Sequence, residues 1–303
     1  MATCRAALVV ILICLTPQSA PLSRRGVVLA TLTSTSAAVL LSCQEPAIAS
    51  TASGSALLLQ VTDPHSYSAL AYAPHRKDES DLPPLILVLH GAGKNAQDML
   101  SDLGSVQGEH AGLIPSLIQS GQAPQELLDN CAVLAPYSYG KPSFYEEPRS
   151  KLLSFVQWAS SPAGKEAGCP LFDPSRIIIL GFSDGATVAV ELLTTGRFAG
   201  GVICSYGFTG PSLPELALQR LANIPVWVFH SADDVIFDVQ NSDRLVRQLR
   251  KRAVDSPLDT IRYSRYDKDP EGFTGSVRGH TMGITASRLP KVYQWMQQVP
   301  PRK

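Results

Sequence analysis

Ser183 lies in the sequence Gly181-Phe-Ser-Asp-Gly185, between an apolar run and a helical pattern. A very tight turn from a strand into a helix holds such a serine in strained backbone geometry, and it leaves no room for side chains two residues before and two residues after. The glycines at 181 and 185 meet this demand. The turn also presents the hydroxyl where a histidine can take its proton, after which the oxygen can attack a carbonyl carbon. This nucleophile-elbow pattern predicts Ser183 as a catalytic nucleophile.

The surroundings of the motif make it more specific, because two glycines around a serine also occur by chance. Residues 177–180 read Ile-Ile-Ile-Leu, which is typical of a buried parallel strand. Residues 186–193 continue with the apolar spacing of a helix. Strand, glycine-flanked serine and helix therefore follow one another in the order that the turn requires.

The rest of the chain alternates strands with helices. Strands are expected near Leu57–Val61, Tyr67–Ala73, Leu85–Leu89, Ala132–Pro136, Arg176–Leu180, Gly201–Ser205, Val226–Phe229 and Thr260–Tyr266. Helices are expected near Pro148–Ser160, Asp184–Thr194, Asp238–Arg252 and Ala286–Gln298, with a short extra one at Pro214–Leu221. This alternation predicts an α/β fold with a mostly parallel eight-stranded sheet and helices on both faces. The first two strands, joined by a few residues, should form an antiparallel hairpin at one edge.

This plan, the elbow and the sequence Leu87-Val-Leu-His-Gly-Ala-Gly93 resemble the serine hydrolases of the α/β-hydrolase superfamily. The nearest members are phospholipase/carboxylesterase, feruloyl-esterase and polyhydroxybutyrate-depolymerase-like proteins. The resemblance covers residues 56–299, and Cys169–Arg176 resembles the segment that leads into the elbow strand. It implies the α/β-hydrolase fold and a catalytic triad in the chain order Ser, Asp, His.

The resemblance also implies an oxyanion hole. Two backbone N–H groups, those of Ala92 and Asp184, would stabilise the negative charge that develops on the carbonyl oxygen. Gly91 and Gly93 let this loop approach the substrate closely, although the same glycines also suit an ordinary turn between a strand and a helix.

The triad acid should follow the strand at residues 226–229, where Asp233 and Asp234 are adjacent. The spacing of the related proteins selects Asp234. Ser231 replaces their glycine, and Asp238 stands where they often have a proline, so Asp233 remains an alternative. The other aspartate would be a capping or turn residue. We expect His230 to be structural.

The triad base should come last in the chain. His280 is the only histidine after Asp234, and it lies in a polar, glycine-rich stretch from Lys268 to Gly283. A loop of this kind is where a catalytic histidine is commonly placed. A lone histidine in a loop can equally be an inert surface group, but its order and uniqueness favour the catalytic interpretation.

These residues predict hydrolysis of a small-molecule carboxylic ester (a lipid, thioester or aryl ester) through an acyl-enzyme on Ser183, without a metal or an organic cofactor. A serine peptidase or acyltransferase would use the same triad, and a non-catalytic binding protein could keep the fold. The segments Leu113–Ile118 and Tyr137–Tyr145 either border the mouth of the site or pack in the core.

The composition of the chain also bears on which binding partners are expected. The chain of 303 residues has 26 basic and 26 acidic residues and is 45% hydrophobic. Such a balance gives no electrostatic signature of binding to nucleic acid or to an anionic membrane. Cys131, Cys169 and Cys204 follow the leader; an odd number argues against a disulfide scaffold, although Cys131 and Cys169 could form one bridge.

The first 49 residues have the composition of a bipartite targeting region. A short apolar run behind Arg5 resembles a secretory signal peptide, and Arg24-Arg25 before a second apolar run resembles a twin-arginine signal. This predicts an exported protein of a plastid thylakoid lumen, with a secreted or periplasmic protein as the alternative. Residues 50–303 would then form a single α/β-hydrolase domain with no stable membrane span.

Overall fold

The structure is a computed structural model that describes residues 58–75, 81–93, 103–105, 107, 110–138, 143–207, 213–253 and 260–302. All of them lie in one compact unit, Thr51–Lys303. The targeting region predicted for residues 1–49 lies outside the described residues and stays a prediction. In the part of the chain that is described, no helix is both long enough and apolar enough to cross a bilayer.

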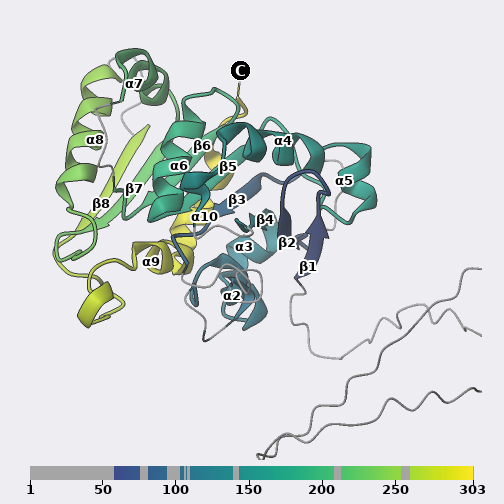
Figure 1. Cartoon of the computed structure of the whole chain (residues 1–303), viewed down its shortest axis with the longest axis horizontal. Coiled ribbons are helices and arrows are strands. Elements are labelled where there is room, and N and C mark those ends of the chain that lie inside the picture. Colours follow the sequence, from purple (N-terminus) through teal and green to yellow (C-terminus); the bar gives the residue numbers. More distant parts are fainter. Residues whose placement is uncertain are drawn as a thin grey trace, which may run out of the picture. The chain divides into compact units, whose positions relative to one another are not determined.

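An eight-stranded sheet forms the centre of this unit (Figure 1). Its spatial order is β1-β2-β4-β3-β5-β6-β7-β8, with antiparallel pairing at β1–β2 and β2–β4 and parallel pairing throughout the rest. The strands are β1 (Leu59–Thr62), β2 (Ser68–Tyr72), β3 (Leu85–Leu89), β4 (Ala132–Pro136), β5 (Ile177–Phe182), β6 (Gly200–Cys204), β7 (Val226–Ser231) and β8 (Ile261–Tyr266). The predicted fold, including the hairpin at one edge, is confirmed.

The central strands are buried on both faces, because alternate side chains enter two separate cores. In β3, Leu85, Leu87 and Leu89 belong to one apolar cluster. Ile86 and Val88 belong to the other cluster. The first cluster is covered by α4 (Arg149–Ala159), α6 (Asp184–Leu193), α7 (Glu215–Ala222) and α8 (Gln240–Arg252). The second cluster is covered by α2 (Ile114–Gln119), α3 (Gln125–Asn130), α9 (Met282–Arg288) and α10 (Pro290–Gln298).

One helix prediction is wrong. The continuous helix expected at Ala286–Gln298 is instead two helices, α9 and α10, which meet at Leu289. Pro290 causes this break, since its ring disfavours helical geometry in the preceding residue and Leu289 is extended at ψ 112°. Helix α10 therefore restarts with Pro290 in its first turn, where the missing N–H costs nothing.

The remaining short elements were not expected from the sequence: α2, α3, α5 (Pro162–Glu166) and the 3₁₀ turns η1 (Phe144–Glu146) and η2 (Gly275–Val277). With only three to six residues each, they are too short to produce a clear helical period.

Candidate active site

The elbow is formed as the glycine spacing requires. β5 ends at Phe182 and α6 begins at Asp184, so Ser183 alone makes the turn, with φ 56° and ψ −122°. A Cβ on Gly181 would lie 2.8 Å from the Cα of Ala186 and closer still to the carbonyl oxygen of Gly185. A Cβ on Gly185 would meet the carbonyl oxygens of Leu89 and His90, the latter at 2.5 Å. Close approach of three backbone segments therefore explains both glycines.

His280 comes from the loop before α9 and reaches this serine. Its Nε2 lies 2.8 Å from Ser183 Oγ. The imidazole also packs against the rings of Phe182 and Phe237, whose centroids lie 5.4 and 5.2 Å away. Both His280 and Ser183 are almost fully buried, with 6% and 7% of their surface exposed. Aromatic packing and hydrogen bonding together fix the orientation of the imidazole.

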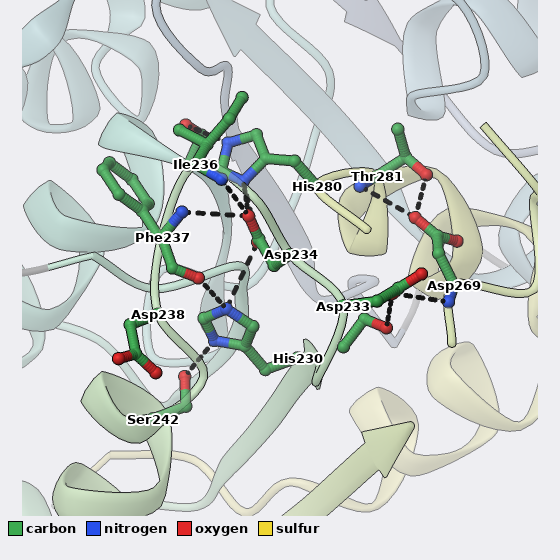
Figure 2. A network of polar contacts seen from close by, with 12 residues as sticks. His230, Asp233, Asp234, Ile236, Phe237, Asp238, Ser242, Asp269, His280 and Thr281 are labelled. Atoms are coloured by element: carbon green, nitrogen blue, oxygen red, sulfur yellow. Dashed lines mark hydrogen bonds and ion pairs between the residues drawn. The ribbon is translucent and has the colours of Figure 1, made fainter. Parts of the chain in front are cut away.

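Of the two adjacent aspartates, Asp234 faces His280 (Figure 2). Its Oδ2 and Oδ1 lie 2.8 and 3.0 Å from His280 Nδ1. A carboxylate can only accept, so Nδ1 carries a hydrogen and Nε2 is left to accept the proton of Ser183. The structure thus brings together Ser183, His280 and Asp234 in the geometry of a serine nucleophile with its base.

The surroundings of Asp234 stabilise its ionised form. The backbone amides of Ile236 and Phe237 donate to its Oδ1 at 2.8 and 2.9 Å. Burial by itself raises the pKa of Asp234, but hydrogen bonds from His230, His280 and the Phe237 amide, with the charge interaction with His280, outweigh it and hold the pKa well below its ordinary value. A permanent anion is what an imidazole needs beside it when it accepts a proton.

Asp233, the alternative acid, points to other partners. Its Oδ1 accepts hydrogen bonds from the Ser231 hydroxyl at 2.6 Å and from the backbone amide of Asp269 at 3.1 Å. Asp233 therefore ties the end of β7 to the beginning of the loop that carries His280.

Asp269 continues this connection, and the sequence reasoning missed it. Its Oδ2 accepts from the backbone amide of Thr281 at 3.0 Å and from the Thr281 hydroxyl (Figure 2). Its Oδ1 accepts from the amide of Glu271. Thr281 follows His280 directly, so a buried carboxylate anchors the base from the side opposite Asp234. The only sequence signal for it is an aspartate before Pro270, which is typical of many ordinary turns.

The predicted oxyanion loop lies at the same site. Ala92 and Asp184 line one cavity together with Ser183 and His280. Behind this loop, His90 Nε2 accepts from the Ser138 amide at 3.3 Å, and its Nδ1 lies 2.6 Å from the Gly91 carbonyl oxygen. His90 thereby joins the loop after β3 to the segment after β4.

The cavity has a volume of about 550 Å³ and mostly apolar walls. From the predicted segment Leu113–Ile118, only Leu113 lines it, while Ile114 and Ile118 pack in the core. No described residue of Tyr137–Tyr145 lines it. The apolar walls come mainly from residues that no sequence pattern groups together: Ile236, Phe237, Phe273, Val277 and Ile284.

The three cysteines of the described region are free and buried, so the structure contains no Cys131–Cys169 bridge. Burial raises the pKa of the Cys131 thiol to about 12, against a smaller opposing effect of Arg176. Burial also raises the pKa of Cys169 to about 11, and Asp63 adds to the effect. Thiols of this kind are unreactive. No group of three or more His, Cys, Asp or Glu side chains in the described ranges could hold a metal ion.

The sheet order and the serine at the turn from β5 into α6 define the α/β-hydrolase fold. Residues 162–271 match the phospholipase/carboxylesterase family, which confirms the resemblance predicted from the sequence. No curated protein matches the chain.

Solved structures share this fold. A thermostable esterase is 21% identical with a TM-score of 0.57, and the match covers 80% of this chain and 63% of that one. A putative dienelactone hydrolase from Klebsiella pneumoniae is 17% identical, with a TM-score of 0.50 and coverage of 81% and 96%. MGS-M1, an α/β hydrolase from a deep-sea metagenome library, is 15% identical, with a TM-score of 0.50 and coverage of 81% and 98%. The family match covers residues 162–271, and the solved structures show a shared fold.

Proposed function

We propose that this protein hydrolyses carboxylic esters through an acyl-enzyme on Ser183. The observation that carries the proposal is the unbroken hydrogen-bonded series from Ser183 through His280 to Asp234, with links of 2.8 Å each. This series opens into a cavity with apolar walls. A buried serine held against an imidazole is the arrangement that activates a hydroxyl for acyl transfer.

In the first half of the reaction, Ser183 Oγ bonds to the carbonyl carbon while His280 Nε2 takes the hydroxyl proton. The carbonyl π electrons move to oxygen, where the amides of Ala92 and Asp184 would stabilise the charge. Collapse of this intermediate breaks the bond to the alcohol oxygen, which receives the proton from His280. Water, activated by the same imidazole, then adds to the acyl carbon and releases the acid and Ser183.

The mostly apolar walls of the cavity favour a substrate with an apolar acyl or aryl group. Ile236, Phe273 and Val277 each line it and still expose 46, 45 and 41% of their surface. We name these three residues the apolar rim. They come from the loops that carry the proposed acid and base, so an apolar group held there would lie close to the reacting atoms.

A fluorophosphonate probe, which forms a covalent bond only with an activated serine, tests the proposal. We expect the purified protein to be labelled, the Ser183→Ala variant to lose labelling, and a Ser276→Ala variant to keep it. Ser276 is the matched control because it lines the same cavity outside the proposed triad. A panel of short-chain, long-chain and aryl esters, with matched amides and thioesters, then sets the substrate class. Absence of labelling in wild-type protein across a broad pH range would contradict the proposal and favour a binding protein.

A further inference from the structure

His230, at the end of β7, lies beside the proposed acid and is fully buried. Its Nε2 is 3.0 Å from the carbonyl oxygen of Phe237 and 3.2 Å from Asp234 Oδ2. Neither oxygen can donate, so Nε2 must carry a hydrogen that it shares between them. His230 therefore donates to the same carboxylate oxygen that approaches His280 most closely.

The other nitrogen of His230 is held as well. Nδ1 lies 2.7 Å from the hydroxyl oxygen of Ser242, a fully buried residue in α8 (Figure 2). The hydroxyl can donate to Nδ1, which leaves the hydrogen of the neutral ring on Nε2. Partners on both nitrogens fix the plane and the tautomer of the imidazole.

We propose that His230 is a positioning residue for Asp234, which it holds toward His280 while taking up part of the carboxylate charge. The inference deepens the proposed function and rests on it. Asp234 Oδ1 already has two backbone donors. Among the described contacts, Oδ2 has His230 and His280 alone. His230 therefore supplies a second donor to Oδ2, beside the Nδ1 N–H of His280.

The charge effect has a definite sign. While His280 is neutral, Asp234 is a buried anion that depends on its donors; once His280 is an imidazolium, the ion pair itself stabilises that anion. A donor from His230 thus stabilises the neutral form of His280 more than its charged form. Loss of the donor should shift the protonation of His280 to higher pH.

Within the described ranges, few other charged groups face this contact. From the acid loop, Asp233 is turned toward Ser231 and Asp269, and Asp238 accepts from the Gln240 amide. From α8 the facing group is the neutral Ser242. His280 itself meets Asp234, Ser183 and the rings of Phe182 and Phe237. A titration at this site therefore reports on the carboxylate of Asp234 and on the imidazoles of His230 and His280.

Two variants of the whole protein test the proposal. His230→Leu removes the donor, whereas His230→Gln keeps an amide N–H near the position of Nε2. We expect the midpoint of the His280 titration, followed by ¹⁵N-edited NMR, to rise by at least about half a pH unit in His230→Leu. In His230→Gln it should stay near the wild-type value. The acid limb of kcat/KM should move in parallel, with a larger change in kcat than in KM.

A Ser242→Ala variant keeps the test decisive if His230→Leu does not fold. It weakens the Nε2 donor indirectly, because the hydroxyl no longer polarises the ring, and should give a smaller shift in the same direction. An unchanged His280 midpoint in folded His230→Leu, or equal shifts in the Leu and Gln variants, would overturn the inference. The NMR titration needs no turnover, so it decides the role of His230 even if Ser183→Ala shows that the proposed reaction is wrong.

Discussion

The carboxylate of Asp233 accepts a hydrogen bond from the backbone amide of Asp269 at 3.1 Å, across 36 positions of the chain. Its neighbour Asp234 instead holds the imidazole of His280. The two adjacent aspartates thus have different roles in the same site. Asp233 holds the loop that carries His280 in place, and Asp234 orients the imidazole of His280.

Separate substitution of Asp233 and Asp234 should distinguish these two roles. Asp234→Asn should lower kcat by about 10⁴-fold, because the amide stabilises the wrong tautomer of His280. Asp233→Ala should cost about tenfold or less, since the imidazole keeps its direct partner. Steady-state kinetics with an aryl ester measure both, and a greater loss in Asp233→Ala would make Asp233 the acid.

Asp269→Ala should loosen the base without unfolding the sheet. The variant removes the acceptor of the Thr281 amide and hydroxyl, directly after His280. We expect kcat to fall by about 10- to 100-fold with a small change in the urea midpoint of unfolding. Asp267→Ala is the matched control, because the side chain of Asp267 is fully exposed. Equal kinetics for the two variants would contradict the anchoring role.

The lowered pKa of Asp234 predicts how stability depends on pH. An unfolded aspartate has a pKa of about 3.9, whereas folded Asp234 stays ionised to lower pH. Its contribution to the free energy of unfolding is therefore complete above the unfolded pKa and is lost as pH falls toward the folded value. Urea unfolding at pH 5.5 and pH 3 should show a smaller loss of stability in Asp234→Asn than in wild type, and an equal loss would argue against a stabilised carboxylate.

The elbow predicts different costs for two glycine substitutions. Gly185→Ala places a methyl group against the carbonyl oxygens of Leu89 and His90, and should destabilise the protein by at least about 3 kcal/mol. Gly196→Ala, at φ +72° with open space around it, should cost about 1 kcal/mol from backbone strain alone. Thermal unfolding compares the two, and similar values would mean that close packing does not set the elbow sequence.

The apolar rim predicts a dependence on acyl chain length. Phe273→Ser should lower kcat/KM for a long-chain or aryl ester by about tenfold, and should change it little for an acetyl ester of the same alcohol. Leu216→Ser is the control, because Leu216 is 59% exposed but lies in α7, outside the cavity lining. An equal effect of Phe273→Ser on both esters would place the apolar group elsewhere.

The fold was largely predictable because its signals are local. The predicted limits of the strands at 85–89 and 132–136 agree with the structure at both ends, since each strand is an unbroken apolar segment. The elbow was equally predictable from the sequence, because the turn leaves no room for side chains at positions 181 and 185, and both positions lie within one five-residue motif.

The candidate site was predictable only in part. Ser183 and His280 could be selected by motif and chain order, but the contacts of Asp269 and His230 join segments that the sequence does not mark as neighbours. The apolar rim was missed for the same reason: Ile236 and Phe273 lie in loops and Val277 in the short 3₁₀ turn η2, where no periodicity marks them.

Gly279 brings the loop that carries His280 into close contact with the loop that carries Asp234. Its φ is +74°, and a Cβ there would collide with the backbone of Asp233 and Asp234. One residue further on is His280, while the Val235 amide donates to the Arg278 carbonyl just before it. The base and the acid thus lie on two loop segments that are in close contact at Gly279. Warming should therefore loosen both segments in the same step. Enzyme activity would then disappear as one cooperative step, at a temperature below the melting of the sheet that supports them.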